Sequence, residues 1–443
     1  MLSVERSALD VGRSAESYSA VSEYLFALKA GGVKFGIDRM TRLAEALGHP
    51  ERLYPVVHVA GTNGKGSVSA MLESILRHAG WRTGLYTSPH LVRLGERVQV
   101  DRRLLTEDEI VAYTRELRPI AERLGTTGPD EHPSFFEFMT AMAFLQFARK
   151  RVDIAVVEVG LGGRLDATNV VQPEVAVITS IGLDHLEQLG DNVAKIAREK
   201  AGIIKPGRPL VLGRVPAEAE QAIREVARAR GAPVHSVRET YGEDLANYPA
   251  CSLAGDYQRW NAATAALTAR LLPARFRLDA AAVARGLGAV QWPGRWQETT
   301  LGGRRLILDA SHNPEGAQVL ENNLHKLVAA TGRAPIIVAG VLGEFRARAL
   351  LDVVCRYGRE VHLLPPHIER ASTHEQLEGY APPEHRAKLR RATLEKVFPD
   401  AHTCALGAPG DTVVVTGSIY LLGEILARIE PGRGTGEARL QDF

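Results

Sequence analysis

The chain has 443 residues, of which 45% are hydrophobic and 24% are charged. That length is too great for one compact core and indicates two or three domains. The 54 basic and 52 acidic residues leave a formal net charge of only +2. Composition therefore excludes a bulk electrostatic attraction to nucleic acid or to anionic membranes, and we expect neither as a partner.

The cysteines and the apolar runs of the sequence indicate the cellular compartment in which the protein is expected. Cys251, Cys355 and Cys404 are widely spaced and match neither a disulfide framework nor a zinc motif, as is usual in a reducing environment. The N-terminal stretch MLSVERSALDVGRSAES is interrupted by charges and lacks the apolar core of a signal peptide. No apolar run approaches the ~20 residues of a membrane span. We therefore expect a cytoplasmic protein.

Short apolar runs rich in β-branched residues alternate with helical patterns along most of the chain. The runs at 55–61, 153–160 and 174–182 are bounded by Gly or Pro and predict buried parallel strands. Helical patterns occupy 107–124 and 135–149. This alternation predicts an α/β protein with a doubly wound, mostly parallel sheet.

The segment 288–300, GAVQWPGRWQETT, interrupts the alternation with Gly, Pro and two Trp residues. A second α/β series follows it, with strands expected at 304–310, 334–343, 359–366 and 411–418. We therefore predict a large first domain, residues 1–295, and a smaller second α/β domain, residues 296–443.

The stretch VAGTNGKGS, residues 59–67, has the context of a phosphate-binding loop. A strand ends at Ala60, a Gly-rich turn follows, and a helical pattern begins near Gly66. Backbone N–H groups and the dipole of that helix face a bound anion in such loops, and Lys65 adds a positive charge. The alternative is a Gly-rich turn with a solvated lysine. The flanking strand and helix favour the phosphate site.

The hydroxyl of the standard P-loop, G-x-x-x-x-G-K-[ST], is displaced by one position here. Gly66 follows Lys65, and the first hydroxyl is that of Ser67. A metal bound with the phosphates would then need ligands from elsewhere. In an open α/β sheet, those ligands are expected at the carboxyl ends of neighbouring strands.

Three polar side chains lie at such strand ends. Ser88 and His185 each follow a predicted strand, and Glu158 lies in an otherwise apolar one. Singly, each has a structural explanation: a helix cap, a loop histidine, and an ion pair with a buried arginine. Together, beside a phosphate loop, they indicate metal binding. Because Mg²⁺ prefers oxygen ligands, the imidazole of His185 suggests a second, different metal position.

The chain resembles folylpolyglutamate synthase and the bifunctional dihydrofolate synthase, within the Mur ligase superfamily. The resemblance runs nearly end to end through HVAGTNGKGS, YTSPHL, VVEVGLGGRLDATN, GLDH, REKAGIIKPG, RWNAATA, WPGRW and DASHNP. It implies a P-loop ATPase domain followed by a smaller Rossmann-like domain, with the active site between them, in a monomer. It also implies an ATP-dependent ligase that adds L-glutamate to folates, and also to dihydropteroate, through an acyl phosphate.

The resemblance further implies which residues bind each ligand. For ATP these are Thr62, Asn63, Gly64, Lys65, Gly66, Ser67, Asn261, Arg295, Asp309 and His312. For two Mg²⁺ ions they are Ser88, Glu158, His185 and Lys200, with Lys65, Lys200 and His185 assigned to catalysis. For the pteroate ring they are Ser134, Phe135, Phe136, Glu137, Leu165, Asp166 and Ala167. The two phenylalanines have an alternative role, as one core-facing side of a helix with Met139 and Met142.

Lys200 belongs to a predicted helix that Asp191 would cap. Val193, Ile196, Ala197 and Lys200 then share one face, and this face is otherwise apolar. A free ammonium is costly there, unless the side chain snorkels to solvent past the helix end. The resemblance implies that Lys200 is carbamylated, which converts a buried cation into an anion that helps to hold the second magnesium ion.

One motif departs from the family pattern. The family usually reads D-G-A-H-N-P, whereas Ala310 and Ser311 follow Asp309 here, so Ala310 would be strained if the glycine required a positive φ.

Two other functions are compatible with parts of the sequence. A Mur-type ligase of cell-wall peptides shares the P-loop and the lysine, although TSPHL and FFEF resemble the folate branch. A P-loop kinase or switch ATPase would need an acceptor site or switch loops, and the sequence has no signature of either.

Overall fold

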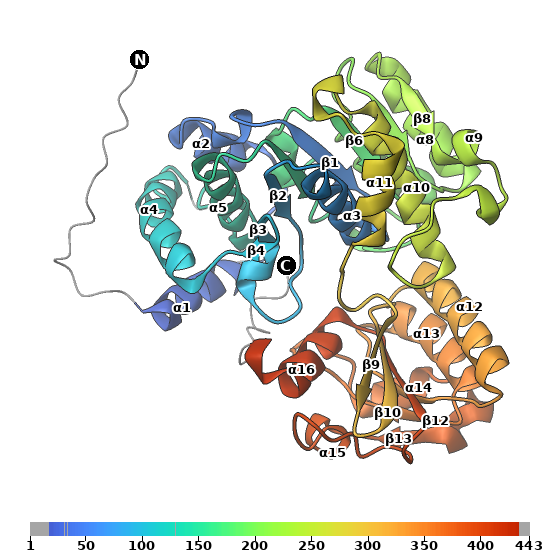
Figure 1. The fold of residues 1–443 in the computed structure, drawn as a ribbon. Helices are drawn as coiled ribbons and strands as arrows, with labels where there is room; N and C mark the ends of the chain where they lie inside the picture. Colours follow the sequence, from blue (N-terminus) through green and yellow to red (C-terminus); the bar gives the residue numbers. More distant parts are fainter. Residues whose placement is uncertain (1–16, 31, 33, 129, 434–443) are drawn as a thin grey trace.

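The structure is a computed structural model that describes residues 17–433, except 31, 33 and 129. It has two lobes, each built around its own sheet with helices on both faces (Figure 1). The predicted α/β class with mostly parallel sheets is therefore confirmed. Residues 1–16, which carry nearly all of the stretch considered for a signal peptide, lie outside the described residues. Within the described ranges, no helix has the length and apolarity needed to cross a membrane.

The first sheet has eight strands in the order β4-β3-β2-β5-β1-β6-β7-β8. Pairing from β2 to β8 is parallel, and β3 and β4 extend one edge in antiparallel pairing. The strands are β1 (Val56–Ala60), β2 (Thr83–Tyr86), β3 (Val98–Val100), β4 (Arg103–Leu104), β5 (Ile154–Glu158), β6 (Val175–Ile178), β7 (Leu210–Leu212) and β8 (Val234–Ser236). The predicted runs are present as β1, β5 and β6, each shorter than expected because the flanking Pro, Gly and polar residues lie in the connecting loops.

Helices cover both faces of this sheet because its central strands are apolar on both sides. Val57 and Val59 of β1 pack with α3 and α10, whereas Val56 packs in the cluster that contains α5. The helices are α1 (Tyr18–Ala30), α2 (Asp38–Ala46), α3 (Lys65–His78), α4 (Glu107–Gly125), α5 (Phe135–Arg149), α6 (Leu186–Leu189), α7 (Val193–Ala201), α8 (Ala217–Ala229), α9 (Val237–Tyr241), α10 (Asp256–Leu271) and α11 (Ala280–Gly288). Short 3-10 helices include η1 (Pro50–Arg52), η2 (Leu94–Arg97), η3 (Ala167–Val170), η4 (Leu245–Asn247) and η5 (Ala274–Phe276).

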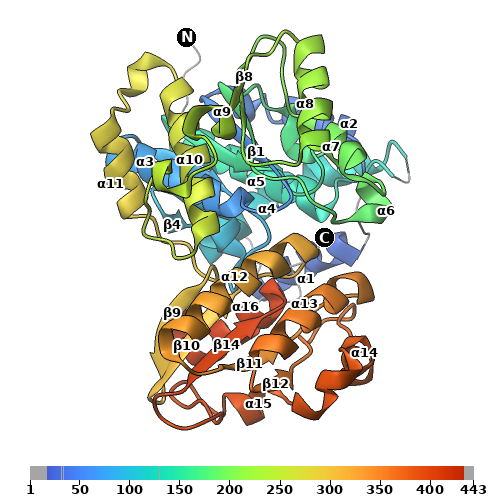
Figure 2. The same cartoon turned by 90° about the vertical axis from the view of Figure 1, so that its right-hand side faces the viewer.

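The second sheet has six strands in the order β13-β12-β11-β14-β10-β9 and is parallel except for the edge strand β9. Its strands are β9 (Gln297–Leu301), β10 (Arg304–Asp309), β11 (Ile336–Ala339), β12 (Glu360–Leu363), β13 (Leu389–Arg391) and β14 (Thr412–Thr416). Its helices are α12 (Pro314–Thr331), α13 (Glu344–Tyr357), α14 (His374–Tyr380), α15 (Leu394–Val397) and α16 (Ile419–Ile429), with η6 (Pro383–Lys388) and η7 (Pro431–Arg433). The expected division between residues 295 and 296 falls in the segment that joins α11 to β9, and Figure 2 shows the second lobe below the first.

Side-chain caps set where the site-bearing helices begin. Asn313 caps α12, and Pro314 occupies its first turn, where a missing N–H costs nothing. The expected cap of α7 was wrong by one residue: Asn192 accepts the hydrogen bond from Lys195 N at 2.9 Å. The Asp191 carboxylate instead pairs with the Lys195 ammonium at 3.0 Å. Either residue type can cap a helix, and the extended backbone of Asn192 decides between them.

The helix after the phosphate loop, α3, is held by an unusually close neighbour, α11. A Cβ on Gly286 of α11 would lie 2.3 Å from Ile75 Cα of α3. Ser74 Oγ of α3 also donates a 2.7 Å hydrogen bond to Gly286 O. The two helices therefore meet backbone to backbone, and this contact orients the helix that begins at Lys65.

We predict that Gly286→Ala destabilises the protein by about 1–3 kcal/mol, because the added methyl group forces the two helices apart. Gly288→Ala is the matched control, since the Cβ of that residue would meet nothing within 4 Å. It should leave stability unchanged or raise it by up to ~1 kcal/mol through helix propensity. Thermal unfolding of the two variants tests this, and equal midpoints would contradict the close packing.

Candidate active site

The turn between β1 and α3 forms a loop. Where this loop comes closest to α10, only glycine fits. Gly64 has φ 82°, and a Cβ there would lie 2.5 Å from Asn261 Oδ1 of α10. The Lys65 ammonium donates to Gly61 O at 3.0 Å and to Thr62 O at 3.2 Å, which holds it over the loop. Unpaired N–H groups and the dipole at the start of α3 make this loop an anion site.

Packing against an indole explains why glycine replaces the usual hydroxyl residue after the lysine. A Cβ on Gly66 would lie 3.0 Å from Cζ2 of Trp292, which belongs to the segment between the lobes. Ser67 is 1% exposed, and its hydroxyl accepts a 3.3 Å hydrogen bond from Gln258 Nε2. The position after Lys65 therefore has no hydroxyl, and the hydroxyl of Ser67 is buried and hydrogen-bonded to Gln258.

A hydroxyl and a carboxylate meet at the carboxyl ends of the neighbouring strands β2 and β5. Ser88 N donates to Glu158 Oε2 at 3.4 Å, and Ser88 Oγ is buried with no hydrogen-bond partner among the described residues. Glu158 is 4% exposed, and within the described ranges its carboxylate forms no ion pair with an arginine, contrary to one alternative above. Burial raises the pKa of Glu158 to about 7, and the positive charge of Lys65 limits that rise. An orphaned hydroxyl beside a buried carboxylate fits the oxygen preference of Mg²⁺.

His185 follows β6 in a left-handed conformation, with φ 50°, beside a strongly anchored carboxylate. Asp184 accepts hydrogen bonds from Arg346 Nη2 at 2.5 Å and from Asn313 Nδ2 at 3.0 Å, and both donors belong to the second lobe. Burial acts to raise the pKa of Asp184, but His312 and the charge of Arg346 hold it well below its usual range. Burial lowers the pKa of His185 to about 4, so its imidazole is neutral near pH 7 and can bind a metal.

Lys200 lies on the buried face of α7, as the periodicity predicted. It is 4% exposed, and Ile196 and Ala197 on the same face are fully buried, whereas Lys195 and Arg198 are exposed. The ammonium therefore does not snorkel to solvent. Burial, followed by the positive charge of Lys65, lowers the pKa of Lys200 to about 7. Among the described residues, no acidic side chain forms an ion pair with it.

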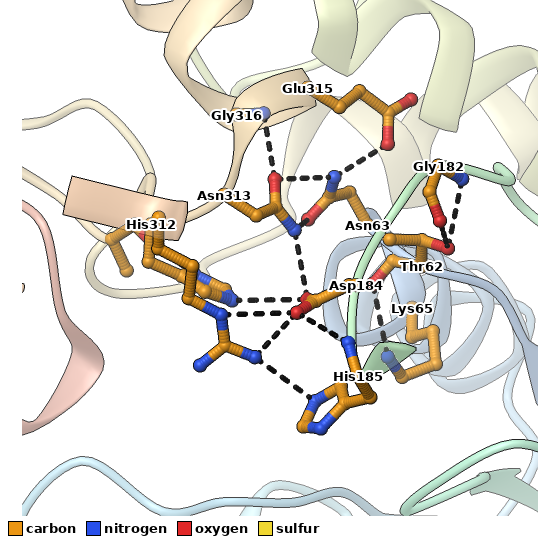
Figure 3. Close-up of polar contacts among 12 residues, drawn as sticks. Thr62, Asn63, Lys65, Gly182, Asp184, His185, His312, Asn313, Glu315 and Gly316 are labelled. Atoms are coloured by element: carbon orange, nitrogen blue, oxygen red, sulfur yellow. Dashed lines mark hydrogen bonds and ion pairs between the residues drawn. The ribbon is translucent and has the colours of Figure 1, made fainter. Parts of the chain in front are cut away.

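The second lobe contacts the phosphate loop directly through polar side chains. Asn63 Nδ2 donates to Glu315 Oε2 at 2.6 Å, and Asn313 Nδ2 donates to Asn63 Oδ1 at 3.0 Å (Figure 3). Ser180 Oγ also donates to Glu315 Oε2, at 3.2 Å. Asn313, Glu315 and Arg346 were not among the predicted site residues. Asn313 belongs to the DASHNP motif and Glu315 directly follows it, so this motif was the available signal for both.

The boundary between the lobes is organised around Asp309, the last residue of β10. Its carboxylate accepts from Trp296 N at 3.0 Å and from Ser311 N at 3.0 Å. Trp296 has φ 47°, a strained conformation for an aromatic residue. Ala310 is not among the residues with positive φ. The strain considered for that position is therefore absent, and alanine replaces the family glycine without backbone cost.

All residues expected at the nucleotide and at the metals border one cavity of about 710 Å³ between the lobes. These are Thr62, Asn63, Gly64, Lys65, Gly66, Ser67, Ser88, Glu158, His185, Lys200, Asn261, Arg295, Asp309 and His312. Asp184, Glu315, Arg346, Arg370 and Tyr420 border it as well.

All residues expected at the pteroate ring border a second pocket, of about 40 Å³. These are Ser134, Phe135, Phe136, Glu137, Leu165, Asp166 and Ala167, joined by Lys29, Gly32, Lys34, Phe35 and Gly36, which the sequence analysis did not identify. Leu161 borders both cavities. The alternative core role holds for Phe135, which is buried with Met139 and Met142. Phe136 is only partly buried.

The two carboxylates of the second pocket are tightly held. Glu137 accepts from Arg39 Nε at 3.1 Å and from Ser134 N at 2.7 Å, which also completes the capping box of α5. Asp166 accepts from Thr168 N and from Leu161 N, both at 2.9 Å. Burial raises the pKa of Asp166, while hydrogen bonds from Thr168 and from Leu161 N act in the opposite direction.

A P-loop at the end of a central strand, facing a second α/β lobe across a cavity, has the arrangement of the Mur ligase class. A family model described as the Mur ligase middle domain matches residues 59–246. The chain is 34% identical to the dihydrofolate synthase/folylpolyglutamate synthase of Bacillus subtilis (strain 168), across 90% of this chain and 96% of that protein. It is 33% identical to the protein of the same name from Escherichia coli (strain K12), across 94% and 96%. The chain therefore belongs to the dihydrofolate synthase/folylpolyglutamate synthase family of ATP-dependent ligases.

Solved structures with the same fold carry relevant ligands. Escherichia coli FolC in complex with DHPP and ADP has a TM-score of 0.80 and 30% identity, covering 96% of this chain and 100% of that one. Mycobacterium tuberculosis folylpolyglutamate synthase complexed with ADP has a TM-score of 0.79 and 31% identity, covering 92% and 98%.

Proposed function

We propose that this enzyme joins L-glutamate to folates with consumption of ATP, and that it also uses dihydropteroate. The observation that carries the proposal is the adjacency of the phosphate-loop cavity and the second pocket, which share Leu161 as a wall. A substrate with its ring in the second pocket would extend past Leu161 and bring its carboxylate toward the phosphate loop. The names and ligands of the relatives support this assignment.

The chemistry follows from charge and position. A carboxylate oxygen of the folate attacks the γ-phosphorus of ATP, and the bond from that phosphorus to the bridging oxygen breaks. ADP departs, and the folate then carries an acyl phosphate. The amino nitrogen of glutamate attacks the acyl carbon, the carbon–oxygen bond breaks, and phosphate leaves as the nitrogen loses its proton. Lys65 and the N–H groups at the start of α3 hold the phosphates, so catalysis rests on orientation and charge neutralisation.

We propose two magnesium sites at the edge of this cavity. Ser88 and Glu158 would hold the first ion, and His185 with a carbamate on Lys200 would hold the second. Magnesium bound there supplies Lewis-acid neutralisation of phosphate charge. The first site is supported by the buried hydroxyl of Ser88, which has no hydrogen-bond partner among the described residues, and by the buried carboxylate of Glu158 beside it.

The second pocket suits the polar edge of a pterin ring. Carboxylate oxygens accept hydrogen bonds from N–H groups, and those of Glu137 and Asp166 border this pocket. At about 40 Å³ the pocket is near the volume of one water molecule, so a bicyclic ring requires a wall to move. Phe35, which is 46% exposed on the segment between α1 and α2, is a wall residue with little packing to lose.

We also propose that residues 1–295 and 296–443 act as two domains of a monomeric enzyme. Residues of both domains line the cavity, and the second domain contributes Asn313 and Glu315 at the phosphate loop. ATP bound in the cavity would therefore contact both domains and favour their closed arrangement.

Substrate assays test the function itself. We expect glutamate-dependent ADP release with dihydropteroate and with tetrahydrofolate, and none with a muropeptide nucleotide. Turnover with the muropeptide nucleotide alone would identify a cell-wall ligase, the nearest alternative. ADP release that is independent of any amino acid would identify a kinase or ATPase instead.

The first magnesium site is tested by Glu158→Gln. We expect kcat to fall by at least about a thousandfold, because the buried carboxylate no longer holds the cation that neutralises phosphate charge. In EDTA the variant should unfold at the same or a higher temperature than the wild type, because the amide removes an unpaired buried carboxylate. Mg²⁺ should then stabilise the ADP complex of the wild type more than that of the variant. A near-normal kcat at ordinary magnesium concentrations would remove this site.

The carbamate is tested by Lys200→Ala, with Lys195→Ala on the exposed face of the same helix as the matched control. We expect Lys200→Ala to be nearly inactive and to be partly rescued by acetate or propionate, which replace the lost carboxylate. Lys195→Ala should retain normal activity. Wild-type enzyme prepared with ¹³C-bicarbonate should show a carbamate resonance that Lys200→Ala lacks. A wild-type spectrum without this resonance, together with failed rescue, would refute the modification.

A further inference from the structure

The central strand β1 carries one polar side chain in its interior, His58, and it is fully buried. Its Nε2 lies 2.8 Å from Thr168 Oγ1, whereas its Nδ1 has no hydrogen-bond partner among the described residues. His58 borders neither cavity, so it touches neither the nucleotide nor the ring substrate. An apolar side chain would fill the same space without an unpaired ring nitrogen, so packing alone does not explain a histidine here.

Thr168 connects His58 to the second pocket. Its hydroxyl donates to Asp166 Oδ1, and Thr168 N donates to the same oxygen at 2.9 Å. A hydroxyl has one hydrogen to donate, and a carboxylate has none. Thr168 Oγ1 must therefore accept the hydrogen bond from His58, which requires the tautomer with hydrogen on Nε2. Burial lowers the pKa of His58 to about 3, so the ring is neutral.

Asp166 is the end of this chain of hydrogen bonds and the only one of the three residues that borders the second pocket. Both hydrogen bonds from Thr168 occupy Oδ1, and Leu161 N donates to Oδ2 at 2.9 Å. The backbone N–H of Gly160 also acts on this carboxylate, so Asp166 is held by the 160–161 backbone on one side and by Thr168 on the other. Its carboxylate borders the second pocket in the orientation that these contacts set.

We propose that His58 is a positioning residue for ring recognition: it polarises and orients Thr168, which fixes the orientation of the Asp166 carboxylate that borders the second pocket and receives an N–H group of the substrate ring. This inference rests on the proposed function, because it assigns the ring to the second pocket. It gives the histidine of the HVAGTNGKGS motif a role at the ring site, although that motif otherwise forms the phosphate loop.

The test uses substitutions that change one hydrogen bond at a time. Thr168→Val keeps the shape of the side chain and removes the hydroxyl, whereas Thr168→Ser keeps the hydroxyl. His58→Gln retains an amide N–H near the position of Nε2, and His58→Leu removes it. Thr268→Val is the control for a buried threonine, because Thr268 is fully buried on α10 and its hydroxyl donates only to Thr264 O, at 2.8 Å.

We expect Thr168→Val and His58→Leu to raise the KM for dihydropteroate, and its Kd by calorimetry, about tenfold, the size of one lost hydrogen bond to a charged group. The KM for ATP should stay within about twofold. Thr168→Ser and His58→Gln should lie within about threefold of the wild type for both substrates, and Thr268→Val should match the wild type. An unchanged dihydropteroate KM in Thr168→Val, or an equal loss for ATP, would overturn the proposal.

A second measurement separates the proposal from the proposed function. In ¹⁵N-histidine-labelled enzyme we expect the His58 ring as the neutral Nε2–H tautomer, and we expect its ¹⁵N shifts to change in Thr168→Val but not in Thr268→Val. A charged ring or an Nδ1–H tautomer would overturn the hydrogen-bond chain whatever the substrate is. If the wild type neither binds nor uses dihydropteroate or tetrahydrofolate, the proposed function fails, and the role of His58 at a folate ring fails with it.

Discussion

The convergence of parallel strand ends at one edge of the first sheet is the constraint from which the active site follows. β2, β5, β1 and β6 are neighbours that run in the same direction, so the residues after each strand share that edge. This geometry brings Ser88 and Glu158 together beside the phosphate loop, with His185 at the next strand along. Because β1 lies between β5 and β6, the phosphate loop lies between Glu158 on one side and His185 on the other.

Charge burial makes the two lobes depend on each other. Asp184 and Lys65 lie in the first lobe, yet Asp184 is neutralised by Arg346 from the second. Asp184 immediately precedes His185, so the conformation of the loop after β6 depends on how the second lobe docks. The same is true of Asn63 in the phosphate loop, which bonds to Glu315. Separating the lobes would leave these groups unpaired in the cavity, which favours the closed arrangement.

Most of the fold and of the site could be read from local patterns, whereas contacts between distant segments could not. β-branched runs located the strands, residues at strand ends indicated Lys65 and Glu158, and helical periodicity placed Lys200 on a buried face. Arg346 escaped notice because its role depends on how α13 meets the loop after β6, where it contacts Asp184, and no periodicity records such a contact. His58 escaped for a related reason: one histidine in a strand carries no signal until its partner, 110 positions further along the chain, is known.

The shared wall at Leu161 has a consequence for the length of the product. If the ring binds in the second pocket as proposed, a substrate reaches the phosphate loop with its carboxylate at one set distance from that ring. Each added glutamate would lengthen the molecule and carry the new carboxylate past that position. A second addition would then require the ring to move back by one unit, so elongation would proceed one glutamate at a time.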